Sequence, residues 1–170
     1  MQKLSPVKFV RAGVFGLIVI FFFLPFVLIS CPNKGSVTIK GIDFVTGKVI
    51  SGRAFSAFTD DQRVKPQPFA IIALVCAVAG IVFSFLKEKP AFVLCLAAGA
   101  LGLTCLILLQ GRINAEAYAY RSQGLRVYYQ SGYWTAIAGF VAAIVVTLVL
   151  NPFMKNKIRI KRIFRRRRRR

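Results

Sequence analysis

Four long stretches without a charged residue alternate with polar segments along this chain. They cover residues 12–29, 69–86, 91–109 and 134–150. Within each, apolar residues follow one another without the alternation expected of a strand that has one wet face. At about 1.5 Å per residue, a helix of this length covers roughly 26–28 Å, close to the thickness of a bilayer's hydrocarbon layer. The pattern predicts an all-α membrane protein, a bundle of four antiparallel transmembrane helices.

The segments between the stretches set the expected domain organisation. Residues 1–154 form the predicted membrane domain, with outer loops at 30–68 and 110–133. The link at 87–90 is short enough to predict a tight helical hairpin, and Pro90 suits the first turn of the next helix. Pro25 is expected to kink the first helix near its end.

The first outer loop is the largest polar segment. From residue 37 onward it mixes β-branched residues with glycines, which predicts short strands and turns in an irregular or β-hairpin extracytoplasmic loop. Gly47 has two readings: with Thr46 it forms a hairpin turn, or it ends a short helix that begins near Ile42.

Composition narrows the possible chemistry. Hydrophobic residues make up 56% of the chain, histidine is absent and only five residues are acidic. The lack of histidine removes the commonest general base and most zinc sites. The outer-loop carboxylates have no base, nucleophile or metal partner at a recognisable spacing: Asp43, Asp60, Asp61 and Glu116. We therefore expect a non-enzymatic protein with no catalytic residues, no metal site and no cofactor.

Charge and aromatic residues predict an orientation. The net charge of +20 is concentrated in short flanks of the apolar stretches and in the C-terminal tail. Short basic segments stay on the cytoplasmic side, so both termini are expected in the cytoplasm, with the chain multi-pass in a bacterial-type inner membrane. All tyrosines and the one tryptophan lie in or beside the second outer loop. That loop is expected to lie against the outer leaflet or to cap the bundle.

Small residues four positions apart mark the last three stretches. Such faces let helix backbones approach closely in lipid, either within one chain or between copies in a homo-oligomer. The predicted helix-packing residues are Cys76, Gly80, Ser84, Ala91, Cys95, Gly99, Thr135, Gly139 and Ala143.

The polybasic tail, residues 155–170, is predicted to contact anionic lipid headgroups on the cytoplasmic side. Nucleic acid is the less favoured partner, because no aromatic stacking platform accompanies the cations. The expected lipid contacts are Lys155, Lys157, Arg159, Lys161, Arg162, Arg165 and Arg166.

Cys31 introduces an alternative. A basic N-terminus, an apolar run and the sequence Leu28-Ile29-Ser30-Cys31 are typical of a bacterial lipoprotein signal, in which the cysteine is lipidated after cleavage. The run is also long enough to be retained as a helix, which is the favoured reading.

Three short motifs carry a resemblance. Leu24-Pro25-Phe26 running into Ser30-Cys31, then Gly41-Ile42-Asp43 with Gly47, and then Gly132-Tyr133-Trp134 resemble small bacterial four-span membrane proteins of uncharacterised activity. The resemblance implies a bacterial source and no particular activity. The leading functional expectation is an accessory or scaffold subunit that acts through helix packing and outer-loop contacts. An oligomeric channel or small-solute carrier, and a protein lipidated at Cys31, are the alternatives.

Overall fold

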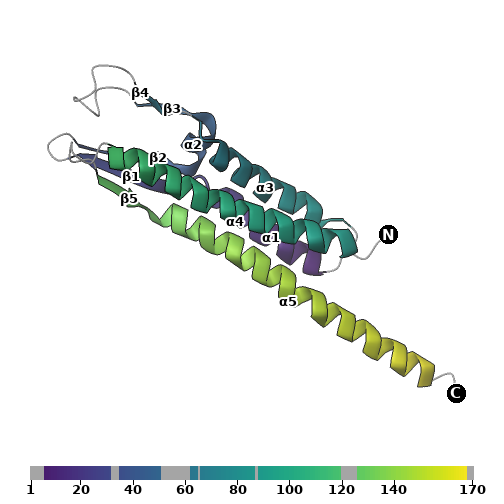
Figure 1. Ribbon diagram of the computed structural model, residues 1–170. Coiled ribbons are helices and arrows are strands. Elements are labelled where there is room, and N and C mark those ends of the chain that lie inside the picture. The colour runs from purple at the N-terminus through teal and green to yellow at the C-terminus, as the bar shows by residue number, and fades with distance from the viewer. Residues whose placement is uncertain are drawn as a thin grey trace.

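The protein consists of four long helices with a small sheet at one end. The computed structural model describes residues 6–31, 35–50, 62–64, 66–86, 88–119 and 126–167. The helices are α1 (Pro6–Phe21), α2 (Gly41–Thr46), α3 (Pro68–Ser84), α4 (Glu88–Ala119) and α5 (Ser131–Arg167). The strands are β1 (Pro25–Cys31), β2 (Gly35–Lys40), β3 (Lys48–Ile50), β4 (Gln62–Val64) and β5 (Arg126–Tyr129). The long helices lie side by side, and α5 projects beyond the end opposite the sheet (Figure 1).

The first apolar stretch is divided between a helix and a strand. The helix α1 ends at Phe21, and the Leu24 N–H donates to the Phe21 carbonyl at 3.0 Å in a tight final turn. Pro25 has no N–H and disfavours helix at the residue before it, so the chain leaves the turn in extended form. The remaining residues of the stretch form β1 instead of a kinked helix.

Two helices, and not four, are long and apolar enough to cross a membrane. They are Pro90–Tyr118 within α4 and Ser131–Val149 within α5. At 16 and 17 residues, α1 and α3 cover only about 24–26 Å, short of a hydrocarbon layer of roughly 30 Å. The predicted four-transmembrane-helix bundle is therefore wrong. The described chain is mostly helical, with two candidate spans and a three-stranded antiparallel sheet.

The sheet joins segments that are far apart in sequence. Its order is β2-β1-β5, with β1 in the centre and antiparallel to both neighbours. Val27 lies opposite Ile39 on one side and Tyr129 on the other. The predicted second outer loop is thus shorter than expected, because α4 continues to Ala119 and β5 follows at Arg126.

The first outer segment contains β2, α2 and a separate antiparallel pair, β3–β4. Gly47 has a φ of 75° and its N–H donates to the Asp43 carbonyl at 2.9 Å, so it ends α2. Of the two readings of Gly47, the helix end is confirmed. The tight link between the second and third apolar stretches is also confirmed, since α3 ends at Ser84 and α4 begins at Glu88.

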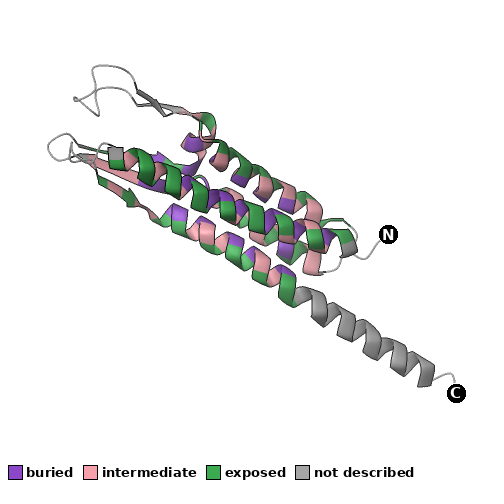
Figure 2. Ribbon diagram, viewed as in Figure 1, coloured by how far each residue is buried: buried purple, intermediate pink, exposed green. Residues whose placement is uncertain are grey.

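The core lies between the four helices and continues beneath β1. Its largest side chains include Phe15, Phe22, Phe26 and Phe140, none of which is exposed. The outer faces of the same helices carry exposed Leu, Ile, Val and Phe side chains. Figure 2 shows buried residues turned inward and exposed residues along the outside of each helix.

Candidate functional site

The densest set of specific contacts lies where the helix bundle meets the sheet. Here the turn between α1 and β1 is held by the start of α2 and by the residue before α5. The Ile42 N–H donates to the Phe22 carbonyl at 2.8 Å, and the Gln130 N–H donates to the Phe26 carbonyl at 2.8 Å. Backbone hydrogen bonds therefore fix two separate segments to this turn and to the start of β1.

Two glycines allow this close approach. A Cβ at Gly41 would lie 2.7 Å from the Phe26 ring, and one at Gly132 would lie 2.6 Å from the Pro25 carbonyl oxygen. Both contacts are too short for any side chain. The three sequence motifs that contain Pro25, Gly41 and Gly132 thus meet at one place in the fold.

Tyr133 is the central side chain of this junction and is 1% exposed. Its ring packs edge-on against Phe26, with centroids 6.1 Å apart. Its hydroxyl donates to acceptors on α4, the Gln110 Oε1 at 3.1 Å and the Leu106 carbonyl at 3.2 Å. Tyr133 thus links the start of α5 to Phe26 of β1 and to α4.

Tyr129 extends the same network from β5. Its hydroxyl donates to the Asn114 Oδ1 at 2.7 Å and approaches the Gln110 carbonyl at 3.3 Å. Burial raises the pKa of Tyr129 to about 12, so the phenol stays protonated and remains a donor at physiological pH. We call Gln110, Asn114, Tyr129 and Tyr133 the junction network.

The junction network fastens β5 and the start of α5 to α4 through tyrosine hydroxyls. Asp43 lies nearby at the start of α2, where its carboxylate accepts the Lys40 N–H at 3.0 Å, a helix-capping role. Within the described ranges, no three His, Cys, Asp or Glu side chains gather as metal ligands. Asp60 and Asp61 lie outside those ranges.

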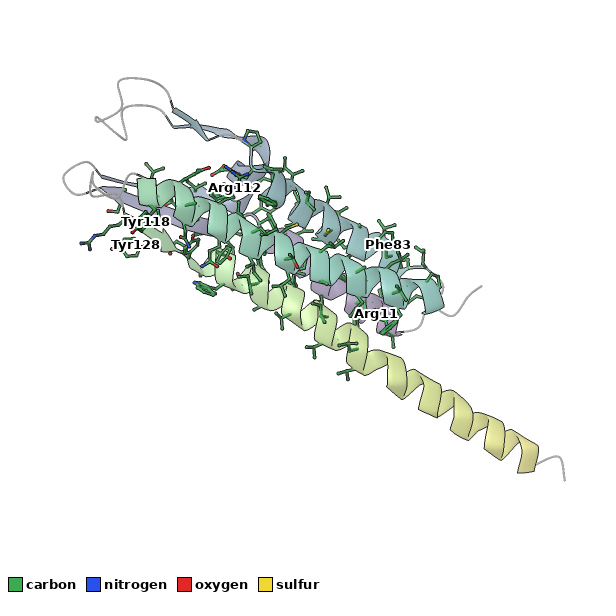
Figure 3. The ribbon with its side chains drawn as sticks, in the orientation of Figure 1. Arg11, Phe83, Arg112, Tyr118 and Tyr128 are labelled. Carbon is green, nitrogen blue, oxygen red and sulfur yellow. The ribbon has the colours of Figure 1, made fainter. Side chains whose placement is uncertain are left out.

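The opposite end of the bundle contains a buried polar layer, with one residue from each long helix. The layer consists of Arg11 (α1), Ser84 (α3), Cys95 (α4) and Thr147 (α5). The Ser84 hydroxyl donates to the Gly80 carbonyl at 2.7 Å and lies 3.8 Å from the Cys95 sulfur. Arg11 is close enough to Cys95 for the two to interact electrostatically. Figure 3 shows Arg11 at this end and Arg112, Tyr118 and Tyr128 near the sheet.

Two atoms of the polar layer have no hydrogen-bond partner within the part of the chain that the structure describes. They are the Arg11 Nε and the Thr147 Oγ1, both fully buried. Arg11 is only 7% exposed, although it lies directly before the first charge-free stretch of the sequence. A signal was present: Arg11 precedes Phe15, Ile18 and Phe22 at helical spacing, on the face that packs into the core.

The predicted helix-packing residues lie mainly where helices touch. Gly80 faces the Phe15 ring of α1, Gly99 faces Ile144 of α5, and Gly139 faces Ile18 of α1. Ser84, Ala91, Cys95 and Ala143 are also buried, whereas Cys76 and Thr135 are only partly so. These contacts occupy the small-residue faces within one chain.

The structure describes the remaining predicted sites only in part. The backbone of Cys31 ends β1 opposite Gly35. Residues 155–167 continue α5, but the side chains of the predicted lipid contacts are outside the described part, as are residues 168–170. The headgroup contacts of the tail therefore stay a prediction.

No protein-family model matches this chain, and no curated protein or solved structure is significantly similar to it.

Proposed function

We propose that this chain is a non-enzymatic integral membrane protein that serves as an accessory or scaffold subunit. The observation that carries the proposal is the apolar exterior of the two candidate spans. Only 39% of the apolar window in α4 and 33% of that in α5 is buried inside the protein. A core helix of a water-soluble protein is mostly buried, and contiguous exposed apolar faces of this extent call for lipid or a partner. Two apolar helices are in themselves compatible with membrane association.

The proposed orientation has α4 and α5 cross a bacterial-type inner membrane, with the turn before α4 and the end of α5 on its cytoplasmic side. The start of α1, the α3–α4 turn and the end of α5 lie at the end of the bundle away from the sheet (Figure 1). Those segments carry the short basic flanks and the polybasic tail. The positive-inside rule therefore supports this direction, with the tail close to anionic headgroups.

The proposed scaffold contacts lie at the sheet end. Because the small-residue faces are occupied within the chain, a partner meets other surfaces. Aromatic side chains are enriched in protein interfaces, and three are exposed near the junction: Tyr118, Tyr128 and Trp134. The channel alternative has less support, since the Ser84 and Thr104 hydroxyls donate to carbonyls of their own helices.

We propose that residues 1–30 are retained and that Cys31 is not a lipidated N-terminus. Cleavage before Cys31 would remove α1 together with nearly all of β1, the central strand of the sheet. It would also remove Phe15, Ile18, Phe22 and Phe26 from the core. Mass measurement of the purified chain tests this point, and a mature N-terminus at Cys31 would contradict it.

Membrane insertion is tested by extraction of isolated membranes with alkaline carbonate and then with detergent. We expect the protein to need detergent. Leu101→Lys, in the exposed face of α4, should sharply reduce the membrane-bound fraction, because a lysine at the centre of a span costs about 3 kcal/mol. Tyr118→Lys, at the end of the same span, is the control and should insert normally. A protein that stays soluble without detergent would contradict the proposal.

The scaffold role is tested by co-purification in a mild detergent. A specific partner should be retained by the wild type and by Val145→Ser, a change on the exposed face of α5. It should be lost from the double variant Tyr128→Ser, Trp134→Ser. Recovery of the protein alone, as a monomer, would argue against a scaffold.

A further inference from the structure

Arg11 is a permanent positive charge enclosed by helices. A guanidinium cannot lose its proton in a protein, so it cannot escape the cost of burial by becoming neutral. An isolated buried charge costs several kcal/mol unless an opposite charge or hydrogen bonds compensate. Among the side chains that the structure describes, no carboxylate pairs with Arg11, and its Nε lacks any acceptor.

Thr147 is the second independent observation. Ser84, Thr104 and Thr135 each donate a hydroxyl hydrogen bond to the carbonyl four residues earlier in their helix. Thr147 is wholly buried, yet its Oγ1 makes no such bond. Its hydroxyl is therefore available to a group inside the bundle.

Helix register places the two unpartnered groups at the same level. Gly139 of α5 faces Ile18 of α1, and these helices are antiparallel. Moving two turns along each helix from this contact brings Arg11 opposite the turn that contains Thr147. The two unsatisfied donors thus belong to one layer.

A second cation lies near this layer. Lys8 lies one turn before Arg11 and donates to the Phe85 carbonyl at 3.2 Å, adding a second cation. Of the Arg11 guanidinium nitrogens only Nε is fully enclosed, so the terminal nitrogens keep the small exposed fraction of the residue.

We propose that this layer binds a single phosphate group, with the Arg11 guanidinium as its main ligand and the Thr147 hydroxyl as a further donor. A guanidinium can donate two parallel hydrogen bonds to a phosphate, and a third oxygen of the tetrahedral group then accepts from the hydroxyl. The phosphate comes either from the headgroup of an anionic lipid or from free inorganic phosphate. The lipid source rests on the proposed membrane association, whereas the inorganic source does not.

The test uses thermal unfolding of the full-length protein in neutral detergent and phosphate-free buffer. One arm adds inorganic phosphate. The other adds phosphatidylglycerol. Its control is diacylglycerol with the same acyl chains, which lacks the phosphate. We expect a saturable rise in Tm in at least one arm and none with diacylglycerol. A rise with phosphatidylglycerol alone assigns the site to lipid, and a rise with inorganic phosphate assigns it to a free anion.

Variants distinguish binding at Arg11 from general electrostatic attraction of the ligand to the basic tail. Arg11→Gln should weaken the binding about tenfold or more, because charge-assisted hydrogen bonds are lost. Arg112→Gln, an exposed arginine at the opposite end, removes the same charge and should bind as the wild type does. Thr147→Val keeps the charge and should weaken binding by a smaller factor.

No rise in Tm in either arm would overturn the proposal, as would equal binding by Arg11→Gln and the wild type. If Arg11→Gln does not fold, wild-type affinity in Thr147→Val would overturn the site as described. Membrane extraction is measured separately, so a failed phosphate site and a failed membrane assignment give different results.

Discussion

The two ends of the helix bundle bury polar side chains in opposite ways. At the sheet end, the Tyr129 and Tyr133 hydroxyls both find acceptors on α4. At the other end, where Ser84 donates to a carbonyl of its own helix, the Arg11 Nε and the Thr147 Oγ1 find no partner among the described residues. Buried polar groups therefore differ in kind between the two ends. At the sheet end, tyrosine hydroxyls join a strand and a helix to α4, and at the other end two buried donors remain available to an acceptor.

The buried polar groups at the two ends should affect the free energy of unfolding in opposite directions. A hydrogen bond made in the folded state contributes about 1 kcal/mol to stability, whereas a buried group left without a partner costs about 1–3 kcal/mol, and a charge costs more. Substitutions at the two ends should therefore change the free energy of unfolding in different directions. Denaturant titration in mixed micelles measures each change below.

The largest effect is expected at the centre of the junction network. Tyr133→Ala should lower the free energy of unfolding by about 3–5 kcal/mol, because it removes a buried aromatic ring together with its hydrogen bonds. Tyr118→Ala is the matched control, since that side chain is 72% exposed, and should change stability by less than about 1 kcal/mol. Equal losses in the two variants would show that the junction is not anchored through Tyr133.

An effect of opposite sign is expected at the other end. In phosphate-free buffer, Arg11→Met should raise the free energy of unfolding by about 1 kcal/mol or more, since an apolar side chain replaces an uncompensated buried charge. Lys8→Met, three residues earlier on the same helix, removes the bond to the Phe85 carbonyl and should cost a few tenths of a kcal/mol. A large destabilisation by Arg11→Met would mean that the charge has a partner within the protein.

The smallest and most direct test compares two hydroxyls. Tyr133→Phe removes only the oxygen and should cost about 1 kcal/mol, because acceptors on α4 lose their donor. Thr147→Val, nearly the same in shape, removes an oxygen without a partner and should leave stability unchanged or slightly raised in the absence of phosphate. If Thr147→Val costs as much as Tyr133→Phe, the contrast between the two ends disappears.

Sequence was sufficient to locate features that depend on local signals. The tight turn before α4 followed from Lys87-Glu88-Lys89-Pro90, and the end of α2 from Gly47, one of two readings that the sequence left open. Small residues at spacing four indicated where helices approach, and Gly80, Gly99 and Gly139 among them face side chains of neighbouring helices. In each case a few adjacent or helically spaced residues contain the information.

The sheet and the polar layer depend on contacts between distant segments, and both were missed. A buried central strand is apolar on both faces, so residues 26–29 cannot be told from a helix by their composition. Its partners, β2 and β5, lie in segments that were assigned to separate loops. Arg11 directly precedes the first charge-free stretch in the sequence, and it is enclosed only because α3 and α5 pack against α1.

Because β1 is the central strand, its two edges can pair at different times during translation. Its partner β2 follows directly in the chain, so these two strands can pair as soon as residue 40 has left the ribosome. The other edge of β1 pairs with Arg126–Tyr129, which leave the ribosome after α3 and α4. Until then this edge presents unpaired N–H and C=O groups, the kind of template on which nascent chains associate wrongly. A translational pause before residue 126 would prolong that exposure, and a chain truncated there would never end it.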